Sequence, residues 1–367
     1  MSLSINIIKK YKSFSLKINF CTDGKPTGLL GASGCGKSLT LRCIAGIETP
    51  DSGRIVLNDR VLYDSEQKIN LPPRERNVGY MFQNYALFPN MTVGENIQIA
   101  VRNKKNKKEV TEQLLTMFRL TNRRDQYPHQ LSGGEQQRVA LARIMAYEPE
   151  MLMLDEPFSA LDSFLKDQLQ QELLELLKEY RGDILMVSHS RDELYRFCQN
   201  IAIVNKGRMI EFGAKAEVFT QPHNIITAKL TGCKNISKIK RISDYEVEAL
   251  DWNIILQTGK FVEEDIRYVG IRAHNIKPVR ELKIEGQNEA PLVQAYENVI
   301  KINMVGFSEG PFENSIIIRN SECSSEEGKL WWIVPKQTWK EQLHEQLPSH
   351  ISFPKESLLL LQEVTNS

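Results

Sequence analysis

Up to about residue 232, short apolar runs alternate with stretches in which hydrophobic residues recur at helical spacing. Apolar runs of this length are typical of parallel strands that are buried on both faces of a sheet; they are residues 27–30 (TGLL), 151–154 (MLML), 184–187 (ILMV) and 201–204 (IAIV). Residues 164–180 place leucines on one side of a predicted amphipathic helix, and residues 84–147 are mostly helical in pattern. Strands that alternate with helices predict an α/β fold with a doubly wound parallel sheet.

The pattern changes after about residue 232, where helical periodicity fades. Short runs rich in Val, Ile, Tyr and Trp follow, separated by turn residues; they are 245–250, 254–257, 268–272, 299–305, 315–318, 330–334 and 357–361. Such runs predict a small, barrel-like β-domain. We therefore expect two domains, 1–232 with a helical subdomain at about 84–147, and 236–367.

Composition narrows the class of protein. The 367 residues are 41% hydrophobic and 25% charged, with a formal net charge of +1, so no global field favours nucleic acid. No apolar stretch approaches the roughly 20 residues that cross a bilayer, and the first 20 residues resemble a pair of strands more than a signal peptide. Six scattered cysteines contain no C-x-x-C pair, which argues against zinc and suits a reducing cytoplasm.

The first candidate site is the glycine-rich stretch at residues 31–38, GASGCGKS, between a predicted strand and a predicted helix. This order matches the P-loop pattern, in which backbone N–H groups and the helix N-terminus surround phosphate oxygens. Lys37 is expected to reach the β- and γ-phosphates, and the Ser38 hydroxyl to bind Mg²⁺. The phosphate-binding residues expected here are Gly31, Ser33, Gly34, Cys35, Gly36, Lys37, Ser38 and Leu39.

An acidic pair, Asp155 and Glu156, follows the apolar run at 151–154. Together with a P-loop upstream, this pair predicts a second half of the same site. Asp155 is expected to help hold Mg²⁺, and Glu156 to act as the general base for the attacking water.

A second glycine motif, Leu131 to Arg138 (LSGGEQQR), precedes another predicted helix. Read alone, it is either an ordinary turn before a helix or a second phosphate-binding helix terminus. One active site does not need two such termini, but a head-to-tail homodimer does. The P-loop of one subunit and Ser132, Gly133, Gly134 and Glu135 of the other would then enclose one nucleotide.

LSGGE, the P-loop and the MLMLDE strand together resemble the ATPases of the ABC (ATP-binding cassette) family. The resemblance implies a RecA-like P-loop core and ATP with Mg²⁺ as ligands. It also implies that Gln83 contacts Mg²⁺ or the water, that Asp162 crosses the dimer interface, and that His189 contacts the γ-phosphate. The catalytic residues expected are thus Lys37, Gln83, Glu156 and His189, with Ser38, Gln83 and Asp155 at the metal.

Two details of the nucleotide site are expectations of a finer kind. The family stacks adenine on an aromatic residue upstream of the P-loop; Tyr11 is the candidate and Phe14 the alternative. Cys35 lies in the P-loop, where a helix N-terminus can lower the pKa of a thiol, so it is either a reactive thiol or a small filler residue.

The part of the chain after residue 236 resembles the OB-like accessory domains of importer ATPases, with VGIRAHN at 269–275 similar to their "IRxxxI/V" strand. Residues 53–64 and 69–76 are most similar to importers of molybdate and sulfate; a sugar, iron or a polyamine is the alternative solute. The resemblance implies a membrane permease that docks near Gln83 and residues 85–89, an extracytoplasmic solute-binding protein, and a place at the cytoplasmic face of the membrane. A soluble ABC ATPase of translation or DNA repair is disfavoured, because the chain has one cassette and no sustained heptads.

Overall fold

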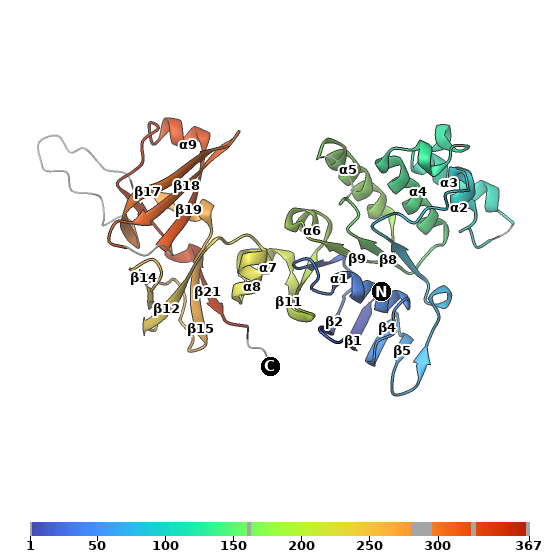
Figure 1. The fold of residues 1–367 in the computed structure, drawn as a ribbon, viewed down its shortest axis with the longest axis horizontal. Helices are drawn as coiled ribbons and strands as arrows, with labels where there is room; N and C mark the ends of the chain where they lie inside the picture. The colour runs from blue at the N-terminus through green and yellow to red at the C-terminus, as the bar shows by residue number, and fades with distance from the viewer. Residues whose placement is uncertain (1, 104, 160–162, 280–295, 324–327, 365–367) are drawn as a thin grey trace, which may run out of the picture. The chain divides into compact units, whose positions relative to one another are not determined.

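The computed structural model describes residues 2–103, 105–159, 163–279, 296–323 and 328–364. The chain divides into two compact units, residues 1–215 and 216–367, which are coloured blue to green and yellow to red in Figure 1. No helix within the described ranges has both the length and the apolar character needed to cross a membrane.

Eleven described strands of the first unit form one sheet in the order β6-β5-β4-β1-β2-β11-β10-β3-β9-β8-β7. The strands are β1 (Leu3–Lys10), β2 (Ser15–Cys21), β3 (Thr27–Leu30), β4 (Ser52–Leu57), β5 (Arg60–Asp64), β6 (Ile69–Asn70), β7 (Val78–Met81), β8 (Met151–Asp155), β9 (Asp183–Ser188), β10 (Asn200–Asn205) and β11 (Arg208–Ala214). The five strands β10, β3, β9, β8 and β7 are mutually parallel, whereas β6, β5, β4, β1 and β2 pair antiparallel. The predicted parallel α/β core is confirmed.

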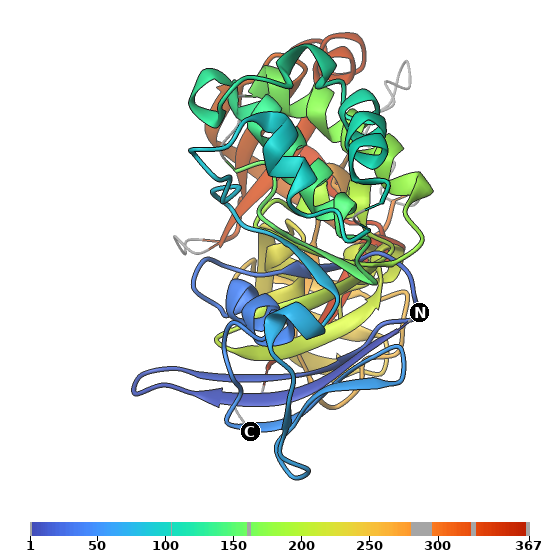
Figure 2. The ribbon, with the colours of Figure 1, turned by 90° about the vertical axis from the view of Figure 1, so that its right-hand side faces the viewer.

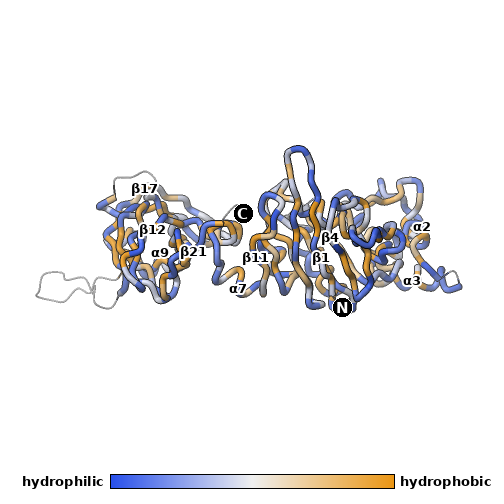
Figure 3. The backbone as a smooth tube through the Cα atoms, turned by 90° about the horizontal axis from the view of Figure 1, so that it is seen from below, coloured by the Kyte–Doolittle hydropathy of each residue, from blue (hydrophilic) through white to orange (hydrophobic). Residues whose placement is uncertain are grey.

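The parallel strands form one end of the sheet, where the sequences of β8 and β9 leave no polar face. Every residue of β8 and of β9 is buried, as expected for strands covered on both faces. β1 and β2 instead alternate buried and exposed residues. In Figure 3, orange and blue stretches alternate in the part of the chain that carries the labels β1 and β4.

The helices of the first unit fall into two groups. α1 (Lys37–Ala45) and α6 (Arg191–Phe197) follow strands of the core, while α2 (Val93–Gln98) packs against α3 (Lys107–Met117) and α4 (Gly133–Ala146). α5 (Ser163–Glu179) is the longest helix of the chain's described parts. Figures 1 and 2 show α2, α3 and α4 gathered at one end of this unit and the strands β1, β4 and β5 at the other.

The second unit contains two five-stranded sheets, in the orders β14-β13-β12-β15-β21 and β16-β20-β17-β18-β19. Both sheets bury residues in one core that includes Val247, Ile271, Ile316 and Trp332, which agrees with the predicted small barrel. The strands are β12 (Asn235–Ser243), β13 (Glu246–Ala249), β14 (Ile254–Gln257), β15 (Ile266–Ile271), β16 (Lys277–Pro278), β17 (Val299–Glu309), β18 (Glu313–Asn320), β19 (Lys329–Pro335), β20 (His350–Ser352) and β21 (Leu358–Gln362).

Three short helices accompany these sheets: α7 (Lys215–Thr220), α8 (Ile225–Leu230) and α9 (Lys336–Glu341). Ala228 of α8 and Cys233 share a small core with Leu359 and Leu361 of β21. The guanidinium of Arg272 donates a hydrogen bond of 2.8 Å to the carbonyl of Thr231. Residues 216–232, expected in the first domain, therefore fall in the second compact unit.

Candidate functional site

The loop between β3 and α1 carries the P-loop sequence, and its glycines are required by the backbone. Gly36 is the N-cap of α1 with φ 110°, a conformation that L side chains rarely adopt. A Cβ on Gly31 would lie 2.2 Å from the carbonyl oxygen of Val204 in β10. Ala32, Ser33 and Gly34 are exposed, so this part of the loop is open to a ligand at the start of the helix.

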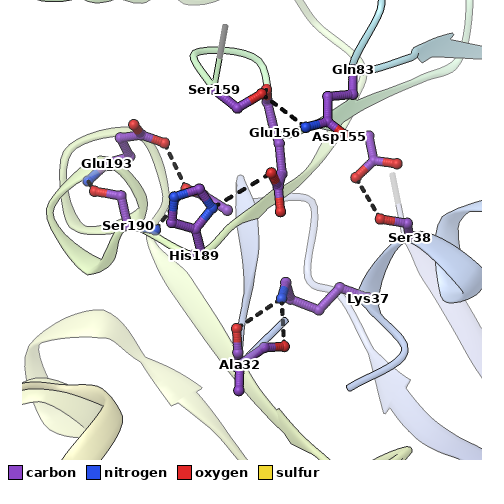
Figure 4. Close-up of polar contacts among 12 residues, drawn as sticks. Ala32, Lys37, Ser38, Gln83, Asp155, Glu156, Ser159, His189, Ser190 and Glu193 are labelled. Carbon is purple, nitrogen blue, oxygen red and sulfur yellow. Dashed lines mark hydrogen bonds and ion pairs between the residues drawn. The ribbon is translucent and has the colours of Figure 1, made fainter. Parts of the chain in front are cut away.

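Lys37 is the first residue of α1, and its side chain folds back into the loop. It is 5% exposed, and its ammonium donates hydrogen bonds of 2.7 Å to the Gly31 carbonyl and 3.0 Å to the Ala32 carbonyl (Figure 4). A cation that the loop carbonyls hold within the P-loop suits a phosphate ligand. Leu39 is half-buried and packs against the main core, so its side chain positions the helix.

Ser38 and Asp155 meet although 117 positions separate them. The Ser38 hydroxyl donates a 2.8 Å hydrogen bond to one oxygen of Asp155, which is 7% exposed at the end of β8. The hydroxyl of Tyr80 in β7 donates a 2.7 Å bond to the other oxygen. Burial, together with this bond to a carboxylate, raises the pKa of Tyr80 and keeps it a donor.

Mg²⁺ fits the oxygen atoms of Ser38 and Asp155. Hydroxyl and carboxylate oxygens are the ligands that this ion prefers, and it usually binds through one or two protein groups and substrate phosphates. In agreement, no group of three or more His, Cys, Asp or Glu within the described ranges is arranged to hold a metal on its own.

Glu156 and His189 stand at the ends of neighbouring parallel strands. Oε2 of Glu156 lies 3.5 Å from Nδ1 of His189, as Figure 4 shows. The side chain of Glu156 is 21% exposed and that of His189 is 58% exposed, so both face an open region. Glu156 has a left-handed backbone, with φ 48°, and its N–H donates to the Val187 carbonyl at 2.9 Å. This turn directs the carboxylate away from the strand.

Gln83 lies beside the chain that follows Glu156. Its amide nitrogen donates to the hydroxyl of Ser159 at 3.3 Å, and that hydroxyl donates to the Glu156 carbonyl at 3.0 Å. The structure thus brings Gln83 to the same edge of the sheet as Asp155 and Glu156. Asp162, the residue expected at a dimer interface, lies outside the described residues.

The LSGGE motif forms the N-terminus of α4. Ser132 is the N-cap, and it exchanges two hydrogen bonds with Glu135 in a capping box. The Ser132 N–H donates to the Glu135 carboxylate at 2.8 Å, and the Glu135 N–H donates to the Ser132 hydroxyl at 3.3 Å. Partial burial by itself would raise the pKa of Glu135, but these bonds and the 2.8 Å ion pair with Arg123 lower it overall. No hydrogen bond or ion pair recorded for the described residues joins residues 131–135 to residues 31–38 of the same chain.

Gly133 is exposed, whereas Gly134 is buried and faces α5. A Cβ on Gly134 would meet the side chain of Leu169 at 2.7 Å. The two glycines therefore differ: Gly134 allows two helices to pack closely, and Gly133 leaves the helix N-terminus open to a ligand.

The two aromatic candidates lie differently with respect to the P-loop. The Phe14 ring is packed against the loop, since a Cβ on Gly36 would lie 3.1 Å from its Cζ. Tyr11 is 46% exposed, with the Lys9 ammonium 5.6 Å from its ring centroid. Phe14, the alternative in the sequence, is thus the aromatic side chain that touches this loop.

Of the two alternatives for Cys35, burial favours the small filler residue over the reactive thiol. The side chain is only 4% exposed, and its burial raises the pKa of the thiol more strongly than the nearby Lys37 ammonium lowers it. The helix N-terminus does not overcome the loss of solvation, because the sulfur points into the core under the loop rather than toward the phosphate position. Cys35 is a small filler residue.

Sequence reasoning missed the polar residues that orient this site. Neither Tyr80, which bonds to Asp155, nor Glu193, which contacts Ser188 beside His189, was singled out. The one available signal was position: Tyr80 lies three residues before Gln83, and Glu193 lies four residues after His189.

Comparisons with known proteins identify the family of the chain. The sequence profile of a family described as "ABC transporter" matches residues 12–159. The chain is 42% identical over 224 residues to the "Fe(3+) ions import ATP-binding protein FbpC" of Haemophilus influenzae. This match covers 60% of this chain and only 62% of that relative. It is 35% identical over 327 residues to the "Sulfate/thiosulfate import ATP-binding protein CysA" of Pseudomonas syringae, covering 84% of this chain and 96% of that relative.

Among solved structures, cbiO1 from Clostridium perfringens, "part of the ABC transporter complex cbiONQ", matches with a TM-score of 0.51 and 26% identity. The match covers 59% of this chain and 90% of that chain. This chain belongs to the ABC transporter family, as an ATP-binding protein.

Proposed function

We propose that this protein is the ATP-hydrolysing subunit of an ABC importer. The observation that carries the proposal is the convergence at one sheet edge of a P-loop hydroxyl, a buried carboxylate and a Glu–His pair: Ser38 to Asp155 at 2.8 Å, and Glu156 to His189 at 3.5 Å. Phosphoryl transfer to water needs a phosphate cradle, a metal position and a base close to the γ-phosphate.

In the proposed reaction, the loop N–H groups and Lys37 bind the β- and γ-phosphates of ATP. Ser38 and Asp155 would hold Mg²⁺, which would neutralise part of the negative charge of the phosphates. Glu156 accepts a proton from the attacking water, whose oxygen forms a bond to the γ-phosphorus while the bond to the ADP oxygen breaks. Gln83 and His189 orient the water and the γ-phosphate.

We further propose that two copies of the chain enclose the nucleotides head to tail. The N-terminus of α4 has an exposed Gly133 and a capped Ser132, but no recorded bond among the described residues joins it to the P-loop of its own chain. A second copy would supply the P-loop that faces it, and the positive end of α4 would then contact the γ-phosphate.

Two substitutions of Ser132 test the composite site. Asp and Asn are comparably good N-caps, so Ser132→Asp and Ser132→Asn should both keep α4 folded. Only aspartate adds a negative charge beside the γ-phosphate, and we expect it to lower ATP turnover about 10-fold or more below the asparagine variant. Equal turnover of the two variants, with the wild-type protein monomeric when loaded with ATP, would remove the composite site from the proposal.

The solute that we propose is an oxyanion of the sulfate and molybdate type. Support comes from the similarity of residues 53–64 and 69–76 to importers of this type, and from the sulfate/thiosulfate relative that aligns over 96% of its length. Iron is the rival that the relative from Haemophilus influenzae favours, and a sugar or a polyamine remains a further alternative. A membrane permease and an extracytoplasmic solute-binding protein complete the proposed complex, with this subunit at the cytoplasmic face of the membrane.

The solute proposal is tested with the chain copurified with its permease and reconstituted into vesicles with the binding protein. We expect sulfate or molybdate to stimulate ATP hydrolysis severalfold, whereas Fe³⁺, a sugar and spermidine leave it at the basal rate. Stimulation by Fe³⁺ alone would reassign the solute and leave the hydrolytic function intact.

A further inference from the structure

The position of His189 depends on the backbone at its two sides, because its own side chain is largely in solvent. That side chain is 58% exposed, and its 3.5 Å approach to Glu156 is the one polar contact recorded for its ring within the described ranges. Ser188 ends β9 and is 1% exposed, whereas Ser190 is the N-cap of α6. Whatever holds these two serines also determines where His189 stands.

One buried residue, Glu193, contacts both serines, Ser188 through its carboxylate and Ser190 through its backbone N–H. Oε2 of Glu193 accepts a 2.6 Å hydrogen bond from the hydroxyl of Ser188, and the Ser188 oxygen in turn accepts a 2.9 Å bond from the Ser190 N–H. The Ser190 hydroxyl accepts a weaker 3.4 Å bond from the Glu193 N–H (Figure 4). These bonds close a ring of polar contacts around the backbone of His189.

The same carboxylate is tied to another helix. Oε1 of Glu193 lies 2.5 Å from the ammonium of Lys166, in the first turn of α5. The side chain of Glu193 is only 7% exposed, and the ion pair with Lys166 and the hydrogen bond from Ser188 give its two oxygens partners there. In the chain, α5 begins at Ser163, seven positions after Glu156. Glu193 therefore connects the helix that follows Glu156 to the strand end that carries His189.

We propose that Glu193 is a positioning residue for hydrolysis: it fixes His189 opposite Glu156 and makes that position depend on α5 through Lys166. The inference rests on the proposed ATPase function and adds a residue that does not touch the nucleotide. A displacement of α5 changes the pull of Lys166 on Glu193, and through Ser188 it changes the distance between His189 and the γ-phosphate.

Glu193→Gln tests the proposal with little change in volume. The amide keeps one acceptor oxygen but places an N–H group against either the Lys166 ammonium or the Ser188 hydroxyl. We expect kcat to fall about 10-fold, because a small displacement of a catalytic group is costly, while the KM for ATP changes less than about 3-fold. Lys166→Met should lower kcat in the same direction, and the Glu193→Gln, Lys166→Met double variant should be no slower than Glu193→Gln alone.

A double-mutant cycle with His189→Ala separates positioning from general damage. If Glu193 acts through His189, Glu193→Gln should cost nothing further in the His189→Ala background. Glu150→Gln is the matched control: this carboxylate also accepts bonds from two side chains, Asn58 and Asn77, but it precedes the opposite end of β8. We expect its kcat to stay within about 2-fold of wild type. Binding of a fluorescent ATP analogue to each variant checks that the nucleotide site is intact.

The outcomes distinguish the two proposals. The positioning role is overturned if Glu193→Gln keeps the wild-type kcat. It is also overturned if Glu193→Gln lowers kcat by the same factor in the His189→Ala background as in the wild type. In both cases ATP hydrolysis by the wild-type protein stands. A wild-type protein that binds ATP without hydrolysing it, alone and with its permease, overturns the proposed function and the inference with it.

Discussion

Replacement of Glu156 by glutamine is expected to lower the rate of ATP hydrolysis by about 100-fold or more while ATP binding persists. The carboxylate is the proton acceptor nearest to His189, at 3.5 Å, and its left-handed backbone directs it into the open region at the end of β8. An amide of equal size cannot accept the proton of the attacking water. Because the P-loop and Asp155 are unchanged, the variant should trap ATP and accumulate in the closed dimer.

Glu148→Gln provides the matched control for this measurement. Glu148 also has a left-handed backbone, with φ 51°, and it is exposed before the opposite end of β8. Its replacement should leave phosphate release and ATP affinity unchanged. If Glu156→Gln turned over ATP at the wild-type rate, Glu156 would have no part in proton transfer, and another base would have to be sought.

The sequence predicted the parts of this fold whose cause is local. The apolar runs within β8, β9 and β10 were recognisable because a strand covered on both faces needs no polar residue in its middle. The P-loop and the LSGGE turn were recognisable for a similar reason. A phosphate-binding helix terminus requires glycines and a capping residue within a few positions of each other, and this spacing can be seen directly in the sequence.

Contacts between distant segments were not predictable in the same way. Asp155 was expected at the metal, but the donor from Tyr80 depends on β7 lying beside β8. In the same way, the ion pair between the Glu193 carboxylate and Lys166 depends on where α5 begins. The motif left two alternatives open for Cys35 because it places the residue at a helix N-terminus, and only the packing of the core shows that its side chain is buried. Such properties follow from the packing of the sheet and not from the motif.

Arg76 is the most consequential residue that the sequence did not reveal. It lies in the segment that was used to compare solute classes, yet its side chain is 0% exposed and serves the fold. NH1 donates 2.8 Å bonds to the carbonyls of Cys43 and Ile44 in the last turn of α1, Nε donates to the Leu71 carbonyl, and NH2 donates to Asn70. The P-loop helix is thus capped at its C-terminus by a buried guanidinium.

Arg76→Met is therefore expected to give the largest loss of stability, about 3 to 5 kcal/mol. Methionine fills much of the volume but donates no hydrogen bonds, so the carbonyls of Cys43, Ile44 and Leu71 each lose a hydrogen bond. Burial lowers the pKa of Arg76 to about 10, so the guanidinium stays charged at pH 7 and its bonds persist across the neutral range. Arg74→Met, at an 85% exposed side chain, is the control and should cost about 0.5 kcal/mol or less.

The chain offers separate spectroscopic probes for the two units, which makes this measurement specific. All four tryptophans, at positions 252, 331, 332 and 339, lie in residues 216–367, whereas the longest helices, α3, α4 and α5, lie in the first unit. In urea, we expect Arg76→Met to shift the unfolding midpoint followed by circular dichroism down by about 1 to 2 M. The midpoint followed by tryptophan fluorescence should stay in place, because every bonding partner of Arg76 belongs to the first unit. A circular dichroism midpoint equal to that of Arg74→Met would show that the buried guanidinium does not stabilise the P-loop helix.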